Sequence, residues 1–397
     1  MRKLSLRIRG RALGLTAALA VGAVALAGPA TAAPVAAQGA HQRTQEALDG
    51  LVAADMPGVA AQTSSPEGQW FGSAGYADTK SKTKRTAKDH IRAGSITKTF
   101  VTTVILQLEA EGKLRLDDSV ERWLPGLLKG NGYDGNKVTL RQLLNHTSGI
   151  HDMVETPEWN AYMNGPGFLE HRYEYRSPEQ IVAMGLKHPP YWAPGTAWHY
   201  SNTNFVIAGM VIEKVTGNAW AREAEKRIVK PLGLRGTTFP GTDPKMPAPH
   251  PVGYSKLYAA NPGPEIHDAT EYNPAWSGAT GEMISTTGDL NRFYSALLGG
   301  KLFPKKQLDA MLTTVPAEDG TNNDVPFDYG LGLIVRSLPC GVKVYGHDGI
   351  VWGSLASTAV TRDGKHALTF QINGDWLAST KPYNDVFRGE FCPKPAA

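Results

Sequence analysis

The chain has 397 residues, of which 41% are hydrophobic and 20% charged, a balance typical of a globular protein with a sizeable core in one large domain or two lobes. Its formal net charge is +4, but basic residues are concentrated in the first 11 positions, so the remainder is near neutral or slightly acidic. This distribution excludes a basic surface for nucleic acid, and we expect no nucleic-acid partner.

The N-terminal segment indicates export. Residues 1–11 carry basic side chains and no acid, residues 12–28 are apolar except for Thr16, and Ala30-Thr31-Ala32 is a small-residue cleavage signal. This order is typical of a secretory signal peptide, here residues 1–33. The alternative is a membrane anchor, but the apolar stretch is shorter than the roughly 20 residues that span a bilayer. We therefore expect a secreted, extracellular protein without stable membrane insertion.

The next residues predict a β-hairpin and a long helix. Residues 57–62 and 69–76 form the expected strands, and Ser65-Pro66-Glu67-Gly68 between them is a turn-forming sequence. The charged stretch at residues 80–88 predicts a solvated loop. Residues 97–111 carry apolar side chains at helical spacing, and Gly112 follows, which predicts a buried helix that ends at this glycine.

The middle and the end of the chain differ in their patterns. Residues 114–264 contain short helical patterns broken by Pro and Gly, among them residues 202–217, whereas residues 329–335, 341–345, 355–361 and 367–372 are rich in β-forming side chains. Strands at both ends imply that the ends meet in one sheet. We predict an α+β fold: an antiparallel sheet flanked by helices (residues 41–112 and 265–397) with a mainly helical lobe inserted (residues 113–264).

Cys340 and Cys392 are the two cysteines of the chain. In an oxidising compartment an even number favours a disulfide, although two separate thiols remain the alternative, because the sequence does not show the distance between them. The sequence has no Cys-x-x-Cys and no His-Glu-x-x-His, so the usual metal-ligand spacings are absent. We expect a mechanism without a metal and without a cofactor.

Ser95-Ile96-Thr97-Lys98 places a hydroxyl and an amine three residues apart at the predicted start of the buried helix. Residues three apart on a helix share a face, so Lys98 can lie beside Ser95. A serine is a weak nucleophile until a neighbouring base activates it, and Lys98 is such a base. The spacing alone is not specific, because Ser and Lys fall three apart by chance in many chains.

Two further segments carry polar side chains suited to catalysis. In Tyr200-Ser201-Asn202 the phenol can move a proton and the amide can hold a substrate group, but Tyr200 alone could be a core aromatic residue and Asn202 a helix N-cap. In Gly346-His347-Asp348-Gly349 the two glycines would let a substrate backbone approach a strand closely. His347 alone could be one of the 11 histidines satisfied by a local hydrogen bond.

Together, in the order Ser-x-x-Lys, Tyr-x-Asn and His-x-Gly, the three segments resemble the penicillin-recognising serine hydrolases, with their β-lactamase/transpeptidase-like fold. The similarity is strongest to the secreted D-alanyl-D-alanine carboxypeptidase of actinomycetes and its relatives among class C β-lactamases and esterases. It extends over residues 48–392 and includes the segments at residues 143–149, 193–195, 200–205, 329–333 and 340–341. The expected substrates are peptidoglycan-type or other D-amino-acid peptides, with β-lactams as covalent ligands of a monomeric enzyme.

The resemblance implies a role for individual catalytic residues. Ser95 would be the acylated nucleophile, Lys98 its base or proton relay, and Tyr200 the group that passes a proton to the leaving group. Asn202 would hold a substrate amide. The backbone N–H groups of Ser95 and Ile350 would form the oxyanion hole, in which losing one donor typically costs about 100- to 1,000-fold in rate.

The resemblance also implies the walls of the site. His347, Asp348, Gly349 and Ile350 would form the strand that faces the scissile bond. Trp276 would flank the pocket, and Trp159 would form a second wall. Cys340 and Cys392 would be joined in a disulfide.

Three positions depart from the carboxypeptidase pattern where that family grips a free terminal carboxylate. Ile334 replaces an arginine, and Asp348 and Ile350 replace threonines. An ionised Asp348 would repel a substrate carboxylate at about 4 Å. Arg336 shares a strand face with Ile334 and would either restore the missing cation or pair with Asp348. We expect weak action on free acids and a preference for amides, esters or internal peptide bonds, which a comparison of an acyl-D-Ala-D-Ala peptide with its C-terminal amide tests.

Other functions remain open from the sequence. A catalytically inactive penicillin-binding or peptidoglycan-binding module is disfavoured by the intact Ser95, Lys98, Tyr200 and Asn202. A β-lactamase requires fast attack of water on the acyl-enzyme, which motifs do not reveal, and an esterase would use the same residues. Labelling by a fluorescent penicillin separates the enzyme from the inactive module.

Overall fold

The computed structural model describes residues 41–259, 263, 265–317 and 325–392. The signal peptide expected at residues 1–33 lies outside this part of the chain. Within it, the main structural feature is a nine-stranded antiparallel sheet in the order β2-β1-β15-β14-β12-β11-β10-β9, with β13 paired to β14. The strands are β1 (Gly58–Ser65), β2 (Gly68–Gly75), β9 (Val315–Pro316), β10 (Phe327–Tyr329), β11 (Ile334–Ser337), β12 (Lys343–Gly346), β13 (Asp348–Val351), β14 (Ser354–Thr361) and β15 (Ala367–Ile372).

Some helices cover the faces of the sheet, and others form a helical region beside it. They are α2 (Gln42–Ala53), α3 (Thr97–Ala110), α4 (Val120–Trp123), α5 (Leu140–Leu144), α6 (Pro157–Met163), α7 (Pro166–His171), α8 (Pro178–Leu186), α9 (Asn202–Thr216), α10 (Trp220–Ala224), α11 (Lys230–Leu232), α12 (Thr287–Leu298), α13 (Lys305–Leu312) and α14 (Lys381–Phe391). Single turns of 3₁₀ helix occur at Gly94–Ile96, Met153–Glu155, Pro274–Trp276 and Gly278–Thr280, and a π-helical turn at Glu225–Val229.

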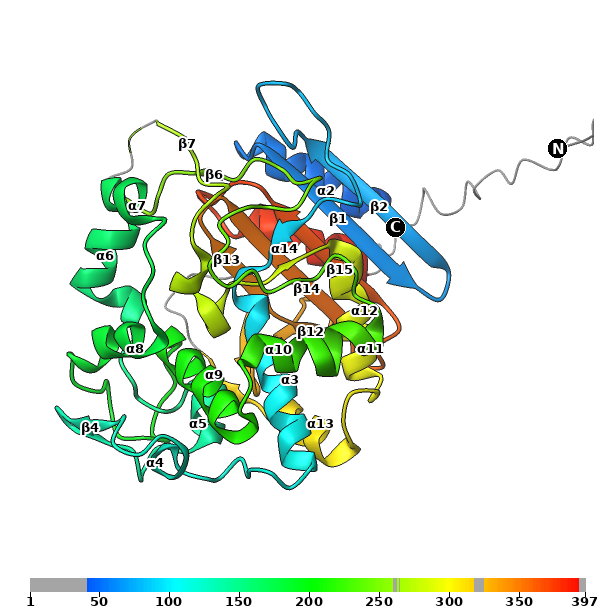
Figure 1. Ribbon diagram of the computed structural model, residues 1–397. Helices are drawn as coiled ribbons and strands as arrows, with labels where there is room; N and C mark the ends of the chain where they lie inside the picture. Colours follow the sequence, from blue (N-terminus) through cyan, green and yellow to red (C-terminus); the bar gives the residue numbers. More distant parts are fainter. Residues whose placement is uncertain (1–40, 260–262, 264, 318–324, 393–397) are drawn as a thin grey trace, which may run out of the picture.

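Three small two-stranded sheets complete the described residues. They are β3 (Ile91–Arg92) with β8 (Ile284–Ser285), β4 (Lys129–Gly130) with β5 (Tyr133–Asp134), and β6 (Tyr254–Ser255) with β7 (His267–Asp268). In Figure 1 the helices from α4 to α9 lie together on one side of the main sheet. No helix of the described residues is both long and apolar enough to cross a membrane.

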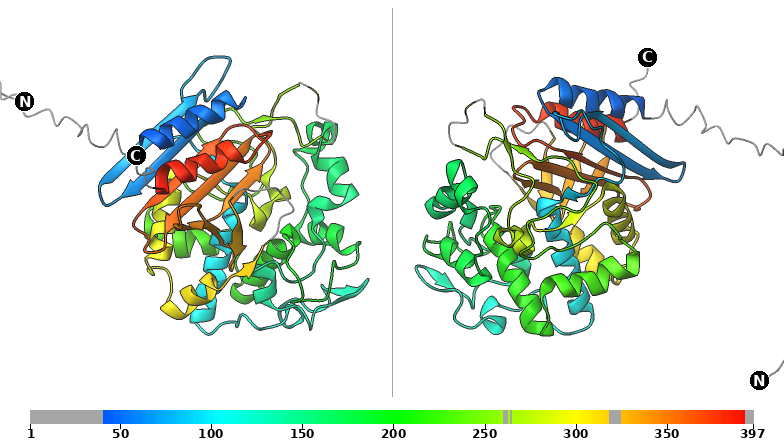
Figure 2. Two further views of the ribbon diagram at one scale, coloured as in Figure 1. Left: turned by 180° about the vertical axis from the view of Figure 1, so that it is seen from behind. Right: turned by 45° about the horizontal axis from the view of Figure 1, so that its top comes forward.

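The two faces of the main sheet are covered by different helices. Along β15, Leu368, Phe370 and Ile372 pack into the core under α2 and α14, whereas the alternate residue Thr369 donates to Asn291 of α12, with 2.8 Å between the oxygens. Alternate residues of a strand point to opposite faces, so this strand is buried on both. Figure 2 shows α2 and α14 side by side across one face. The sheet thereby joins the two ends of the described chain through the pairing of β1 with β15.

Helix α3 lies at the centre of the molecule. Most of its residues from Thr97 to Leu108 are buried on all sides, and the helix is followed by Gly112 with a left-handed φ of +71°. The predicted helix at residues 97–111 is therefore confirmed, as are the hairpin of β1 with β2 and the helix at residues 202–217, observed as α9. Ser95 sits in the 3₁₀ turn that leads into α3, which carries Lys98 into the interior.

The prediction of one continuous strand at residues 329–335 is wrong. The structure divides it into β10 and β11, because the chain turns at Gly332, which has a φ of +58°. A Cβ atom built on Gly332 would lie 2.2 Å from Oγ1 of Thr102 on α3. The turn therefore packs directly on the central helix, a long-range contact that strand propensity does not register.

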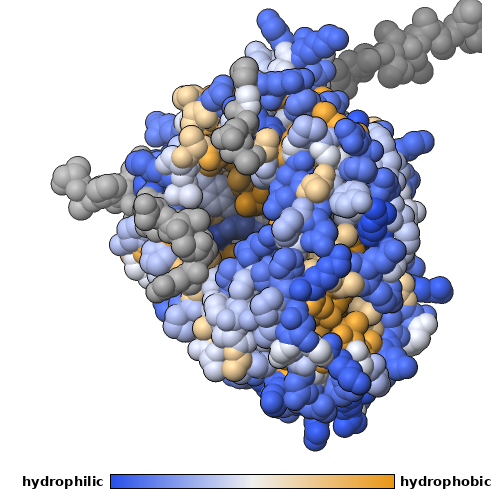
Figure 3. All heavy atoms as spheres, turned by 90° about the vertical axis from the view of Figure 1, so that its left-hand side faces the viewer, coloured by the Kyte–Doolittle hydropathy of each residue, from blue (hydrophilic) through white to orange (hydrophobic). Residues whose placement is uncertain are grey.

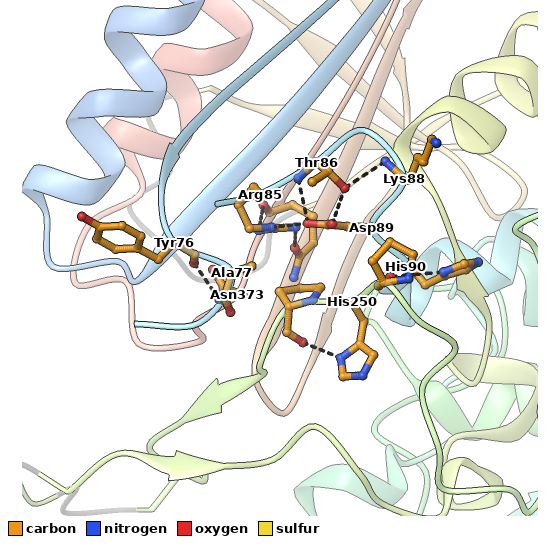
Figure 4. A network of polar contacts seen from close by, with 12 residues as sticks. Tyr76, Ala77, Arg85, Thr86, Lys88, Asp89, His90, His250 and Asn373 are labelled. Atoms are coloured by element: carbon orange, nitrogen blue, oxygen red, sulfur yellow. Dashed lines mark hydrogen bonds and ion pairs between the residues drawn. The ribbon is translucent and has the colours of Figure 1, made fainter. Parts of the chain in front are cut away.

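The solvated loop predicted at residues 80–88 is partly wrong. Most of its side chains are exposed, but Arg85 is buried and donates its Nε to Asp89, with 2.7 Å between the atoms. Arg85 also donates to the backbone and side chain of Gln371 on β15, and Thr86 donates to Asp89 (Figure 4). The loop is fastened to the sheet by this network, because a buried charge needs a partner.

Four helices lie outside the stretches for which the sequence predicted helical patterns: α2, α12, α13 and α14. Cys340, beyond β11, and Cys392, at the end of α14, form a disulfide across a sequence separation of 52 residues. The pairing implied by the resemblance is thus confirmed, and it ties α14 to the sheet.

Candidate active site

Ser95 opens into a cavity of about 510 Å³ between α3, β13 and the helical side of the molecule. Figure 3, viewed from the left-hand side of Figure 1, shows a hollow with hydrophobic side chains along its upper edge and hydrophilic ones inside it. The structure brings together at this cavity the following residues predicted from the sequence: Ser95, Trp159, Tyr200, Asn202, His347, Asp348 and Ile350. These residues come from segments spread over about 250 positions, so only the tertiary fold makes them neighbours.

Lys98 lies directly beneath Ser95. Its Nζ is 2.9 Å from Oγ of Ser95, 2.8 Å from Oδ1 of Asn202 and 2.9 Å from the carbonyl oxygen of Thr280. The side chain is fully buried, and this burial lowers the pKa of the Lys98 amine to about 7, against the opposing charge of Asp152. A neutral amine can donate to Asn202 and Thr280 and turn its lone pair to the Ser95 hydroxyl, which is the arrangement of a general base.

Asp152 orients Asn202 and was missed by the sequence reasoning. Its carboxylate accepts from the backbone N of Asn202 at 3.0 Å and from Nδ2 of the same residue at 2.9 Å, which turns Oδ1 of Asn202 toward Lys98. Burial raises the pKa of Asp152 to about 6, although hydrogen bonds from Val154 and Asn202 act against it. The available signal was an acid close to the apolar residues Ile150, Met153 and Val154.

Tyr200 stands on the other side of Lys98, with its ring centre 5.0 Å from the lysine Nζ. Burial raises the pKa of the Tyr200 phenol, while its hydrogen bond to Ser95 acts in the opposite sense. A protonated phenol beside the nucleophile is suited to donating a proton to a leaving group rather than to accepting one.

His347 belongs to a buried chain of hydrogen bonds. Its Nε2 is 2.7 Å from the hydroxyl of Tyr329, which lies 3.3 Å from Nε2 of His146, and Nδ1 of His146 accepts from the backbone N of Ser201 at 3.1 Å. Burial lowers the pKa of His347 to about 3 and that of His146 well below its usual range. Both rings are therefore neutral, and His347 donates Nδ1–H to the carbonyl of Asp348 at 2.5 Å. The chain positions β13, and its members Tyr329 and His146 had no assigned role.

Two glycines bring β13 against the Ser95 turn. A Cβ atom on Gly349 would lie 1.8 Å from the carbonyl oxygen of Ala93 and 3.0 Å from the backbone N of Ser95, and one on Gly94 would lie 2.8 Å from the backbone N of Ile350. The expectation that Gly349 admits a substrate backbone is corrected, because the protein's own backbone fills that space. The close approach sets the amides of Ser95 and Ile350 near one another, as an oxyanion hole requires.

The aromatic walls differ from expectation at one position. Trp159 lines the cavity, but Trp276 does not: it is fully buried and contacts Trp159 edge to face, with 5.8 Å between the ring centres. Trp276 thus supports the wall from behind. The wall itself is completed by residues that the sequence reasoning did not single out: Trp198, Tyr258, Phe327 and Trp352.

Of the two roles expected for Arg336, the structure shows pairing with Asp348. The Nη2 of Arg336 forms a hydrogen-bonded ion pair with Oδ2 of Asp348, and Arg336 does not line the cavity. Oδ1 of Asp348 accepts from Oγ of Ser357 at 2.5 Å and from the hydroxyl of Tyr383 at 2.6 Å. Arg336 therefore neutralises the acid instead of restoring a cation to the pocket, while Ile334 and Ile350 keep two sides of it apolar.

Among the residues that the structure describes, no group of three or more His, Cys, Asp or Glu side chains is arranged to hold a metal ion. The chemistry available at the cavity is that of a serine nucleophile, an amine base and a phenolic proton donor. Such an arrangement can form and break an acyl-enzyme.

Comparisons with known proteins agree with this geometry. The β-lactamase family model matches residues 43–388. A solved structure of a D-stereospecific amidohydrolase from Streptomyces sp. is 50% identical, with a TM-score of 0.82 over 89% of this chain and 98% of that one. The D-amino acid amidase of Ochrobactrum anthropi SV3, solved with L-phenylalanine amide, is 27% identical, with a TM-score of 0.76 over 88% of this chain and 98% of that one.

Two curated penicillin-binding proteins of Bacillus subtilis (strain 168) are also similar, at 29% and 28% identity over 66% and 69% of this chain. The match spans 57% and 58% of the length of these two relatives. This chain therefore spans less than two thirds of the length of either relative.

Proposed function

The chain belongs to the β-lactamase family and is a serine hydrolase of that superfamily, and from this premise we propose that it hydrolyses amides of D-amino acids through an acyl-enzyme on Ser95. The observation that carries the proposal is the buried Lys98 amine, 2.9 Å from Oγ of Ser95, with a pKa lowered to about 7. Such an amine is partly neutral near pH 7 and can take the serine proton.

The reaction follows from the positions of the side chains. Oγ of Ser95 attacks the substrate carbonyl carbon as its proton passes to Nζ of Lys98, and the amides of Ser95 and Ile350 hold the oxyanion. The C–N bond then breaks as Tyr200 gives its proton to the leaving nitrogen and regains one from Lys98. Water attacks the acyl ester with Lys98 as its base, which releases the acid and restores Ser95.

The cavity favours a substrate with an apolar side chain. Its walls include Trp159, Trp198, Phe327 and Trp352, and its one carboxylate among the described lining residues, Asp348, is already paired with Arg336. Large aromatic walls stabilise an apolar ligand by burying its surface. A D-stereospecific amidohydrolase and a D-amino acid amidase that has been solved with D-phenylalanine share the fold, which supports the choice of D-amino acid amides.

Two further expectations belong to the same proposal. Penicillin-binding relatives support acylation of Ser95 by β-lactams as covalent ligands. The order of basic, apolar and small residues in positions 1–33 supports secretion. Cleavage of a free-acid D-Ala-D-Ala peptide is expected to be weak because the cavity offers no unpaired cation among its described lining residues.

Ammonia release from D- and L-phenylalanine amide tests the proposal. The wild-type protein is expected to favour the D-enantiomer, and Ser95→Ala to lose at least about 1,000-fold in kcat/KM. Ser201→Ala is the matched control, because the Ser201 hydroxyl is buried without a hydrogen-bond partner among the described residues. A covalent penicillin adduct, detected by mass spectrometry, should form on the wild type and not on Ser95→Ala. Undiminished hydrolysis by Ser95→Ala would overturn the assignment of the nucleophile.

A further inference from the structure

The carboxylate of Asp348 occupies an anion-binding site that the protein builds around it. Oδ2 is paired with Nη2 of Arg336, and Oδ1 accepts hydrogen bonds from Ser357 at 2.5 Å and from Tyr383 at 2.6 Å. The donors come from three different elements, β11, β14 and α14. A guanidinium with two hydroxyls is the donor set expected of a site for a carboxylate.

Arg336 has no other counter-ion among the described residues. The residue as a whole is 2% exposed, and its guanidinium carbon lies 4.9 Å from the ring centre of Phe387. Its Nε is buried without a hydrogen-bond partner among the described residues. A buried cation with one anionic partner is strongly dependent on that partner. Removal of the Asp348 carboxylate would leave three donors directed at an empty position.

That position adjoins the reacting groups. Asp348 lines the cavity with Ser95 and Tyr200, and its side chain is 25% exposed, whereas Arg336, Ser357 and Tyr383 lie behind it and do not line the cavity. Asp348 also acts electrostatically on Tyr200, the residue placed to protonate the leaving group. The carboxylate of Asp348 therefore shares the cavity with the nucleophile and acts electrostatically on the group placed to protonate the leaving group.

We propose that Asp348 acts as a built-in substitute for a substrate carboxylate: it fills the anion site formed by Arg336, Ser357 and Tyr383 and restricts the enzyme to substrates whose leaving group is uncharged. The inference rests on the proposed function in that it names the specificity of the same site. It makes Asp348 a specificity-determining residue, and it predicts that Arg336 becomes a carboxylate-binding group when Asp348 is removed.

The kinetic test compares D-Phe-D-Ala with D-Phe-D-Ala amide, which differ in the charge of the leaving group. The measured quantity is the ratio of kcat/KM for the acid to kcat/KM for the amide. The wild-type ratio is expected to be well below one, and Asp348→Ala to raise it by about 10- to 100-fold, as expected when a charge-assisted hydrogen bond is gained. Asp348→Asn, which keeps the shape of the side chain and loses its charge, should raise the ratio in the same direction if the alanine variant folds poorly. An unchanged ratio in both variants overturns the proposal.

A stability test uses formate as a probe that needs no catalysis. Sodium formate should raise the Tm of Asp348→Ala above the value in sodium chloride at equal ionic strength, because formate can occupy the vacated position. Addition of Arg336→Met to this variant should abolish both the formate effect and the altered kinetic ratio. Equal Tm values in the two salts for Asp348→Ala contradict a carboxylate site.

A matched control is available in the Arg85–Asp89 pair, which is buried and lies outside the cavity lining. Asp89→Ala should lower Tm but leave the acid-to-amide ratio at the wild-type value. The two proposals fail in distinguishable ways. If the wild type cleaves neither dipeptide nor D-phenylalanine amide, the proposed function fails, whereas the formate effect on Asp348→Ala still tests the anion site.

Discussion

Two Arg–Asp pairs in the described part of the protein have a buried arginine and differ in what surrounds them. In the pair of Arg85 and Asp89, Nε of the arginine donates to the acid (Figure 4). Nη1 and Nη2 of Arg85 donate to Gln371. In the pair of Arg336 and Asp348, Nε of the arginine has no partner, and a quarter of the acid side chain is exposed at the cavity.

The difference shows how an ion pair acquires a functional role. The first pair is four residues apart in the sequence and fastens a loop to β15, so all of its contacts serve the fold. The second joins β11 to β13 and has one face toward the nucleophile. Both pairs join a guanidinium to a carboxylate, and the exposed face of Asp348 is the feature to which we attribute substrate selection.

The largest expected effect comes from breaking the structural pair. Asp89→Ala leaves the buried Arg85 without its ionic partner. This change should lower the free energy of unfolding by about 3–5 kcal/mol, because an unpaired buried charge is costly. Urea denaturation measures this loss. If Asp89→Ala lowers the free energy of unfolding by less than Asp348→Ala does, the Arg85–Asp89 pair does not contribute more to stability than the Arg336–Asp348 pair.

The next effect concerns the arginine of the second pair. Arg336→Met should lower the free energy of unfolding by about 2 kcal/mol, less than Arg85→Met, because Asp348 keeps its hydrogen bonds from Ser357 and Tyr383 and reaches solvent. Thermal and urea unfolding of the two methionine variants, measured together, check the order. The reverse order would show that Arg336 is the main support of β13.

The third test asks which acids act on the catalytic amine. Lys98 is a base only when neutral, and its pKa is about 7, so kcat/KM should rise with pH through about 7 and then level off. Asp152→Asn removes a negative charge that favours protonated Lys98, so the midpoint should move to lower pH, by on the order of one unit or 1.4 kcal/mol. Asp89→Asn should leave the midpoint unchanged, since Asp89 is not among the groups that shift the pKa of Lys98. A midpoint that stays in place in Asp152→Asn would separate Asp152 from the base.

The smallest effect is expected from one hydroxyl of the anion site. Tyr383→Phe removes a single hydrogen bond to Asp348 and should cost about 1 kcal/mol of stability while the Arg336 ion pair persists. The acid-to-amide ratio should stay close to the wild-type value, because the Asp348 carboxylate still fills its site. A large rise in that ratio would mean that Tyr383, rather than the carboxylate, excludes the substrate acid.

Several elements could be predicted from the sequence because their causes are local. The apolar spacing of residues 97–111 predicts α3, and the three-residue spacing of Ser95 and Lys98 places the amine beside the hydroxyl. The hairpin of β1 and β2 follows from a turn between two strand-forming segments. The order of the three polar segments indicated the family and, through it, the disulfide.

Other features depend on contacts between distant segments. The turn at Gly332 packs on α3, and Trp276 packs against Trp159 and Tyr162 of α6 instead of lining the cavity. Asp152 and the chain from His146 through Tyr329 to His347 likewise gain their positions from long-range hydrogen bonds. Periodicity and turn chemistry report neighbours a few residues apart, so these roles were not visible in the sequence.

The sequence by itself determined that this protein carries a serine with a lysine at helical spacing, on a fold of sheet and helices. Only the tertiary structure decided that Lys98 is buried enough for its pKa to fall to about 7 and that Arg336 faces Asp348 rather than the cavity. The physical reason is that burial and charge pairing depend on every segment packed around a group, whereas residue spacing depends on the segment alone.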